Sequence, residues 1–313
     1  MEVKLPAGKY VVAVSGGVDS MVLLALLEKQ AKSLKQKAKS KKISSFEPLA
    51  FGFELIVAHF NHGIRPDSDE DEELVAKTAQ QYGLVFESAR GNLGLETSEE
   101  AARRARYQFL ENVKKKHKAQ AIITAHHQDD ALETAIINIL RGTRRRGLSS
   151  MARSEIKRPL LNFSKGEIVK YAKQQGLLWR EDSTNQDPKY LRNYLRLRVM
   201  PNLRAEQKRE LIKNLDKVAK INNVLNKQIA ILSQQLLKNS RIERAEFTVL
   251  PPEVARELMV YWLREIGIFQ VDQKLIDRLV TVIKTAKPGT SHEINGQIKL
   301  KISTSSAYFE SRR

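Results

Sequence analysis

The segment from Tyr10 to Leu27 constrains the fold more than any other part of the chain. Residues 10–14 form an unbroken apolar run, which is typical of a strand buried in a parallel sheet. Residues 21–27 are again apolar and continue as a core helix. Between them lies the small, hydroxyl-rich turn SGGVDS at residues 15–20. A helix start of this kind presents free N–H groups and a positive dipole end, so we expect it to bind phosphate.

The residue types in this turn suit a nucleotide. Gly16 and Gly17 let the backbone approach a bulky anion, and Ser15 and Ser20 add hydroxyl donors. Asp19 is itself negative, so we expect it to hold a magnesium ion that the phosphates share. The alternative, an ordinary strand-to-helix turn capped by Asp19 or Ser20, stays open. The turn lacks the lysine of the Walker motif and the spacing of the dinucleotide motif, which disfavours both classes.

The SGGxDS pattern resembles the phosphate loop of the N-type ATP pyrophosphatases. That family splits ATP between its α and β phosphates and adenylates an oxygen of a second substrate. The resemblance places Ser15, Gly16, Gly17, Val18, Asp19 and Ser20 at the nucleotide. It implies ATP and Mg²⁺ as the cofactors.

Composition points to a polyanionic partner. The 313 residues carry 54 Lys plus Arg against 36 Asp plus Glu, a net charge of +18. Nucleic acid is the expected partner, with a merely solvated basic surface as the alternative. The absence of cysteine excludes disulfides, thiol nucleophiles and cysteine-dependent sulfur transfer. No apolar stretch approaches a membrane span and no signal peptide is evident, so we expect a cytoplasmic protein without membrane contact.

Strand and helix patterns alternate through the first half of the chain. Apolar runs predict strands at residues 53–58, 84–86 and 121–125, and acidic or capping residues predict helix starts near Asp67 and Ser98. This alternation predicts the α/β class with a doubly wound, mostly parallel sheet, whose ligands bind outside the carboxyl ends of the strands. His59 and His62 follow the second strand, at such an end, and we assign them to the nucleotide. The lysine-rich residues 29–42 favour a solvated helix extension over a flexible insert.

A third group of polar residues follows the fourth strand, where HHQDDALE enters a helix at residues 126–133. Asp130 and Glu133 are three residues apart and share a helix face. Two histidines and three carboxylates exceed what helix capping requires, although capping remains the alternative. The H-E-x-x-H zinc spacing is absent. Such a cluster of anions is suited to a cationic substrate such as an amine.

Taken together, these and later motifs resemble the bacterial tRNA(Ile)-lysidine synthetase family. The motifs occur in the family's order over about residues 11–201: SGGVDS, HFNHGIRPDSDED, EEAARRARY, TAHHQDDALET, LRGTRRRGLSSM, RPLL, WREDSTN and RNYLR. The resemblance implies an adenine nucleotide alpha hydrolase-like fold. It also implies a ligase that uses ATP to adenylate C2 of the wobble cytidine of tRNA-Ile with a CAU anticodon. Free L-lysine then attacks through its amino group, giving lysidine, AMP and pyrophosphate.

The resemblance assigns roles to particular residues. Asp19, Asp130 and Glu133 are expected to be catalytic, with Asp19 on the metal. The residues implied in substrate binding are His126, Asp130 and Glu133 for the lysine, Arg103 and Arg106 for phosphate or RNA backbone, and Arg192 and Arg196 near the adenylated base. Which of the last two arginines senses the base stays open. Arg144 to Arg146 are expected to form a basic loop that clamps the anticodon stem, and Trp179 is expected to be a packing residue.

From residue 201 onward the pattern changes to long helices. Apolar residues from Leu211 to Leu236 predict one long helix, Pro252 starts another, and residues 275–283 predict a third. An Asn295-Gly296 turn predicts a hairpin near the end. We therefore expect a catalytic domain at 1–200 and a small, mostly helical tRNA-binding domain at 201–313. Many family members carry a further C-terminal domain, so rejection of tRNA-Met is expected to use fewer contacts here; whether the chain forms a homodimer stays open.

Two other functions remain as alternatives. One is an amide-forming synthetase of the same superfamily that acts on a small metabolite. The +18 charge and the later motifs argue against it. The other is a catalytically silent RNA-binding protein, for which the phosphate loop and the carboxylate cluster would have no use.

Overall fold

The computed structural model describes residues 1–40, 52–63, 67–91, 99–143, 145–148, 156–181, 191–269 and 271–311. The chain divides into two compact units, Met1–Val218 and Ala219–Arg313. The predicted boundary at residue 200 concerns functional domains and stays a prediction. In the described ranges, no helix combines the length and apolar character needed to cross a membrane.

A five-stranded parallel sheet forms the centre of the first unit, in the order β3-β2-β1-β4-β5. Its strands are β1 Gly8–Ala13, β2 Phe53–Asn61, β3 Val85–Arg90, β4 Ala121–Ile123 and β5 Ile156–Lys157. In register, Val12 lies between Val57 of β2 and Ile123 of β4. The predicted doubly wound α/β class is therefore confirmed. The edge strand β5 was not predicted, because two residues carry no detectable pattern.

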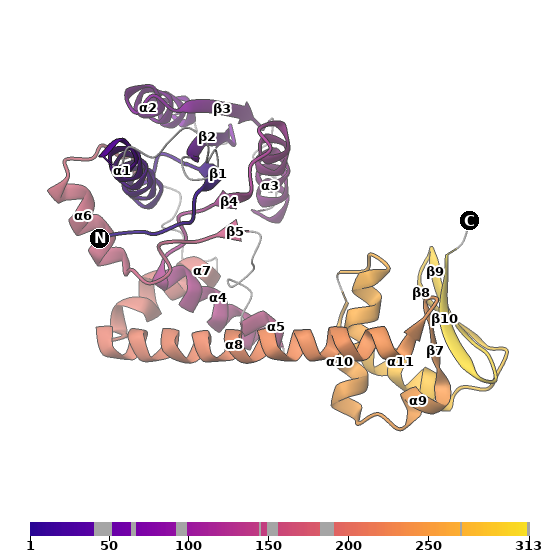
Figure 1. Ribbon diagram of the computed structural model, residues 1–313. Helices are drawn as coiled ribbons and strands as arrows, with labels where there is room; N and C mark the ends of the chain where they lie inside the picture. Colours follow the sequence, from indigo (N-terminus) through magenta and orange to yellow (C-terminus); the bar gives the residue numbers. More distant parts are fainter. Residues whose placement is uncertain are drawn as a thin grey trace. The chain divides into compact units, whose positions relative to one another are not determined.

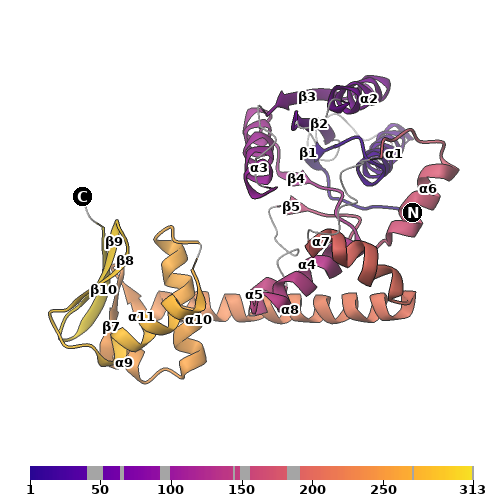
Figure 2. The same cartoon turned by 180° about the vertical axis from the view of Figure 1, so that it is seen from behind.

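Helices cover both faces of this sheet. The described helices of the unit are α1 Val18–Ser40, α2 Ser68–Gln81, α3 Glu99–Lys116, α4 Gln128–Leu140, α5 Arg145–Leu148, α6 Lys165–Gln174, α7 Leu191–Tyr194, the π-helical turn η3 Leu195–Val199 and the 3₁₀ turn η4 Met200–Asn202. One face packs against α1, α2 and α6, and the other packs against α3 (Figure 1). Figure 2 shows the same layers from behind. The strand order reverses between β1 and β4, which is where doubly wound sheets bind ligands.

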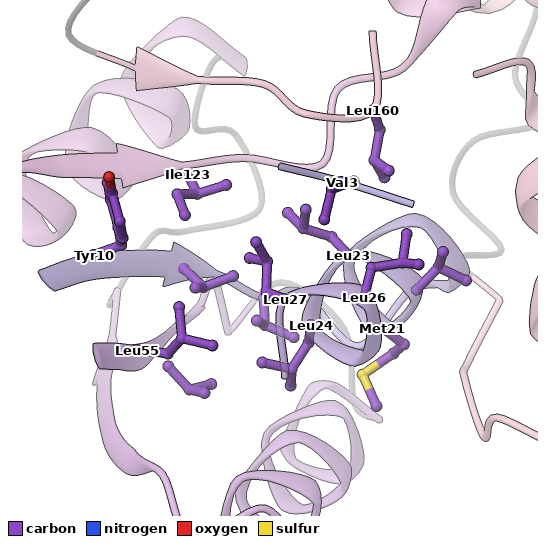
Figure 3. Close-up of a cluster of buried hydrophobic side chains, with 14 of the residues drawn as sticks. Val3, Tyr10, Met21, Leu23, Leu24, Leu26, Leu27, Leu55, Ile123 and Leu160 are labelled. Carbon is purple, nitrogen blue, oxygen red and sulfur yellow. The ribbon is translucent and has the colours of Figure 1, made fainter. Parts of the chain in front are cut away.

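The main core fixes the turn between β1 and α1. Leu23, Leu24 and Leu27 of α1 are fully buried in the same cluster as Tyr10 of β1 (Figure 3). Burying each leucine side chain stabilises the fold by about 1.5–3 kcal/mol. The first turn of α1 is therefore held rigidly above the carboxyl end of β1. Beyond this core α1 continues to Ser40, so the predicted helix extension is correct for the described part of residues 29–42.

The second unit contains a five-stranded antiparallel sheet in the order β6-β7-β10-β9-β8. Its strands are β6 Leu237–Lys238, β7 Arg241–Glu243, β8 Ser291–Asn295, β9 Ile298–Ile302 and β10 Ser306–Ser311, and its helices are α9 Arg244–Thr248, α10 Pro252–Glu265 and α11 Gln273–Thr285. The long helix α8 Ala205–Leu236 leads into it. The predicted hairpin is present as β8 and β9. It belongs to a larger sheet, because β10 pairs with both β9 and the distant β7.

Candidate functional site

The loop between β1 and α1 is organised by its two serines. The Ser20 hydroxyl accepts a hydrogen bond from the Ser15 backbone N–H (3.1 Å) and donates to the Gly17 carbonyl (2.9 Å). The Ser15 and Ser20 hydroxyls lie 3.2 Å apart. These bonds close the loop on itself at the first turn of α1. Val18 begins the helix and packs into the core, so its contribution to an anion site is through its backbone.

Gly16 requires a backbone that other residues rarely adopt. Its φ is +89°, and a Cβ there would lie 3.4 Å from the Cβ of Asp71. The Gly16 carbonyl accepts a hydrogen bond from the Arg180 backbone N–H at 3.0 Å. The Arg180 side chain in turn pairs with Asp67, Glu70 and Asp71 at the start of α2. Arg180 thus joins the loop to the acidic start of α2.

Asp19 lies in the first turn of α1, and its carboxylate already has a cation beside it. The Lys165 ammonium donates to both carboxylate oxygens, at 2.7 and 2.8 Å. His127 Nε2 lies 3.8 Å from one of the same oxygens. Lys165 is the first residue of α6 and His127 directly precedes α4. Three helix starts, those of α1, α4 and α6, therefore meet at Asp19.

Asp130 continues this set of contacts into α4. Its carboxylate accepts a hydrogen bond from the His127 backbone N–H at 3.0 Å and lies 3.4 Å from His127 Nε2. An Arg196 guanidinium nitrogen lies 3.2 Å from its other oxygen. Burial raises the pKa of Asp130, but His127 and Arg196 outweigh burial and hold that pKa below its ordinary value. Asp130 is therefore a stable anion.

Glu133, one helical turn further along α4, has no exposed surface. The Arg196 guanidinium donates to both of its carboxylate oxygens, each at 2.9 Å. Burial raises the pKa of Glu133, and the ion pair with Arg196 only partly opposes this. Asp130 and Glu133 therefore share a face and a partner, as their spacing predicts. Their environments differ, so Glu133 is the better proton acceptor of the two.

These contacts form one continuous series that we call the charged chain. In order, its members are Lys165, Asp19, His127, Asp130, Arg196 and Glu133. It runs from the loop at residues 15–20 through α4 to η3. The predicted nucleotide loop and the predicted amine cluster are thus two ends of one site.

His126 lies beside this chain but does not join it. Its Nδ1 lies 2.8 Å from the Thr124 hydroxyl. Burial, helped by Arg158, Arg106 and Arg103, lowers the pKa of His126 to about 3 against the opposing effect of Asp130. His126 is therefore neutral at physiological pH. Because Arg103 and Arg106 of α3 help to lower the pKa of His126, both arginines lie near this end of the sheet.

Arg103 and Arg106 both pack on the ring of Tyr107. Their guanidinium carbons lie 4.9 and 5.4 Å from its centroid. Arg103 is exposed and Arg106 is half-buried. The second pair of predicted arginines, Arg192 and Arg196, is split, and Arg196 belongs to the charged chain. Arg192 donates to the Thr134 hydroxyl at 3.1 Å and lies 3.8 Å from Glu133.

The two histidines after β2 differ in position. His59 is only 3% exposed, and its Nδ1 lies 2.9 Å from the Val14 carbonyl, directly before the loop. Burial lowers the pKa of His59, so the ring is neutral and Nδ1 carries the proton that Val14 accepts. Its Nε2 is buried and has no hydrogen-bond partner among the described residues. His62 lies past the end of β2, with its ring edge-on to Phe60 at 4.9 Å.

Two members of the charged chain escaped the sequence analysis as site residues. Lys165 lies 146 positions from Asp19, in a segment without a recognisable motif. His127 was noted only as part of a histidine pair. Arg145 and Arg146 lie in the short helix α5 rather than in the loop we predicted. Arg144 is outside the described residues, as are Asp182, Ser183 and Asn185 of the WREDSTN motif. Trp179 packs against the main core, as expected.

Comparison with known protein families shows to which family this chain belongs. A family model described as the PP-loop domain matches residues 2–203, which include every member of the charged chain. The chain belongs to the PP-loop family. Proteins of the PP-loop family use ATP.

Two curated proteins are similar to this chain over almost all of its length. A tRNA(Ile)-lysidine synthase from Thermus thermophilus is 33% identical over 94% of this chain and 55% of its own length. One from Streptococcus sanguinis is 32% identical over 93% of this chain and 63% of its own length. The chain thus spans little more than half the length of these relatives. Among solved structures, a U34-tRNA thiolase from Methanococcus maripaludis has the same fold, with a TM-score of 0.52, 19% identity, and coverage of 69% of this chain and 74% of its own.

The PP-loop residues present here fit a nucleotide with magnesium. Gly16, with its positive φ, brings the loop close against Asp71, and His59 offers a buried nitrogen without a partner in the described region. Asp19 supplies the oxygen ligand that Mg²⁺ prefers. No group of three or more metal-ligating residues occurs within the described ranges. Mg²⁺ is usually bound through one or two carboxylates together with substrate phosphates.

Proposed function

We propose that this protein joins L-lysine to C2 of the wobble cytidine of tRNA-Ile with a CAU anticodon, through an adenylated cytidine, releasing AMP and pyrophosphate. The observation that carries the proposal is the charged chain. It connects the ATP loop at Asp19 to the carboxylates of Asp130 and Glu133 through direct contacts. Adenylation and attack by an amine can therefore take place in one site. The names of the curated relatives support the same assignment.

In this proposal the loop binds the phosphates. The N–H groups at the start of α1 bind the anion, the hydroxyls of Ser15 and Ser20 hold the loop in the shape that presents them, and Asp19 holds the magnesium ion. Bound there, Mg²⁺ would neutralise charge on the departing pyrophosphate. The protein's own part is to fix the ATP relative to the cytidine oxygen, which is the main requirement of such a transfer.

The carboxylates of α4 receive the lysine amine in this proposal. The amine must lose a proton before it attacks. Glu133 suits this step, because burial raises its pKa. His126 does not suit it, because a pKa of about 3 makes the ring a poor base. We therefore assign His126 to positioning and Glu133 to proton acceptance, with Asp130 as the fixed negative charge.

The basic surface is the proposed contact for the tRNA. Arg103 and Arg106 of α3 and Arg192 of α7 lie around the same end of the sheet and are suited to phosphates. Arg196, which pairs with both carboxylates, is the arginine of its motif nearest the amine. We also propose a cytoplasmic location and a functional division of the chain near residue 200.

The direct test is mass analysis of tRNA-Ile with a CAU anticodon after incubation with the protein, ATP, magnesium and labelled lysine, each omitted in turn. Label in the wobble cytidine, with equimolar AMP, is the expected result. AMP release without tRNA, in the presence of ammonia or another small acceptor, would instead favour the metabolite-amidating synthetases. RNA binding without AMP release would favour the catalytically silent alternative.

A further inference from the structure

Lys165 is the cation in direct contact with the ATP loop, and the sequence gives it no role. Its ammonium group donates to both oxygens of Asp19. The loop itself, SGGVDS, lacks the lysine with which Walker loops contact the β- and γ-phosphates. Lys165 brings a lysine to the equivalent place from a different helix. A compact, flexible ammonium is well suited to bind phosphate as a point charge.

The backbone of Lys165 is held in place at the start of α6. Ser164 caps α6, accepting from the Glu167 N–H at 3.3 Å, while the Glu167 carboxylate accepts from the Ser164 N–H at 2.8 Å. The Phe163 carbonyl accepts a hydrogen bond from the Gln128 N–H at 3.0 Å, which ties this turn to the start of α4. Ile168 on the same helix is fully buried in the main core.

The ammonium group retains capacity for a ligand. A lysine ammonium has three N–H donors, and Asp19 accepts from two of them. No partner for the third occurs among the described residues. The side chain is 43% exposed, so a ligand at the loop can reach it. A polyphosphate at residues 15–20 would lie beside Asp19 and hence beside this donor.

We propose that Lys165 is a ligand of the β- and γ-phosphates of ATP and of the departing pyrophosphate, positioned for them by Asp19. This inference rests on the proposed function, because it assumes that ATP is cleaved to AMP and pyrophosphate. Lys165 supplies the positive charge that the loop lacks. Its contact with the leaving group would strengthen as negative charge develops there.

The test compares Lys165→Ala, Lys165→Arg and the control Lys208→Ala by calorimetric binding of ATP and AMP to the full chain. Lys208 pairs with Asp129 at 3.0 Å, so it is a second lysine–aspartate pair at the start of α4. Lys165→Ala should weaken ATP binding about tenfold or more and leave AMP binding unchanged, since AMP lacks the outer phosphates. Lys165→Arg should restore most of the affinity, and Lys208→Ala should resemble the wild type.

A second measurement separates a phosphate contact from an effect through Asp19. ATP binding is repeated in EDTA, where a role that operates only through the metal at Asp19 disappears. The same fold-loss for Lys165→Ala with and without magnesium is the expected result. The inference is overturned if Lys165→Ala binds ATP like the wild type, if it loses ATP and AMP equally, or if its loss vanishes in EDTA. Wild-type protein that binds no ATP would instead refute the proposed function.

Discussion

Glu133 and Asp130 are chemically similar residues that the structure makes different. Both contact Arg196, but Glu133 is fully buried and Asp130 also has His127 as a neighbour. Burial therefore raises the pKa of Glu133, whereas charges hold the pKa of Asp130 low. Two carboxylates with divergent pKa values are typical of sites that move a proton.

Glu133→Gln should raise the lysine concentration needed for half-maximal turnover by about tenfold or more, because a charge that faces the amine is lost. The dissociation constant for ATP should change by less than about threefold. Steady-state kinetics and calorimetry measure the two quantities. Glu87→Gln is the matched control, since Glu87 is a paired, partly buried carboxylate of β3, on Lys116 and His117. A larger effect on ATP than on lysine would contradict the assignment of Glu133 to the amine.

His126 should make the fold less stable in acid. Its pKa is lowered to about 3 by burial and by neighbouring arginines, against about 6.5 in an unfolded chain. Between these values the unfolded state binds more protons, so the free energy of unfolding falls as pH falls from 6.5. His126→Gln should therefore lose less stability than the wild type between pH 7 and pH 4, by roughly 3 kcal/mol. Urea unfolding at several pH values checks this, and parallel pH curves for both proteins would contradict it.

At the scale of elements, local patterns predicted what lies close together in sequence. The strand, loop and helix from Tyr10 onward, and the acidic start of α4, each depend on a few consecutive residues, and the structure contains them. Lys165 and β10 depend on partners far along the chain, Asp19 and β7 respectively, so no local pattern could reveal them. The assignment of individual site residues to ATP, lysine and RNA stays a prediction.

Ser164, the N-cap residue of α6, should affect ATP binding as well as stability. Ser164→Ala removes the N-cap hydrogen bond and should lower the free energy of unfolding by about 1 kcal/mol. Asp272→Ala, which removes the N-cap of α11 in the second unit, should cost a similar amount. Only Ser164→Ala should also weaken ATP binding, because Lys165 follows it directly. Thermal unfolding and calorimetry test this, and equal ATP affinities in the two variants would show that the cap does not position Lys165.

The whole molecule is strongly basic, and this charge sets how it should meet RNA. A net charge of +18 is spread over both halves of the chain. Proteins that neutralise several phosphates release counterions, so their affinity for nucleic acid falls steeply with salt. Binding of small ligands lacks this steep dependence. The salt dependence therefore separates an RNA substrate from a small metabolite without any assay of catalysis.

We expect the affinity for tRNA-Ile to fall by about 10³-fold or more between roughly 50 and 200 mM monovalent salt. AMP affinity should change by less than about threefold over the same range. Filter binding and calorimetry provide the two measurements. Lys116→Ala serves as a control, since that lysine already pairs with Glu87 and its loss should not reduce the salt slope. A flat salt dependence for tRNA would leave the basic charge without a nucleic-acid role.

The charged chain also constrains the order in which parts of the protein can fold during synthesis. When the ribosome has released residues up to Leu140, Asp19, Asp130 and Glu133 are all present, but Lys165 and Arg196 have yet to be made. The three carboxylates would then face one another without their cations, which disfavours their close approach. Contacts between such distant segments form slowly. The charged chain is therefore complete only after the segment through Arg196 has emerged and docked, which makes its formation a late event of folding.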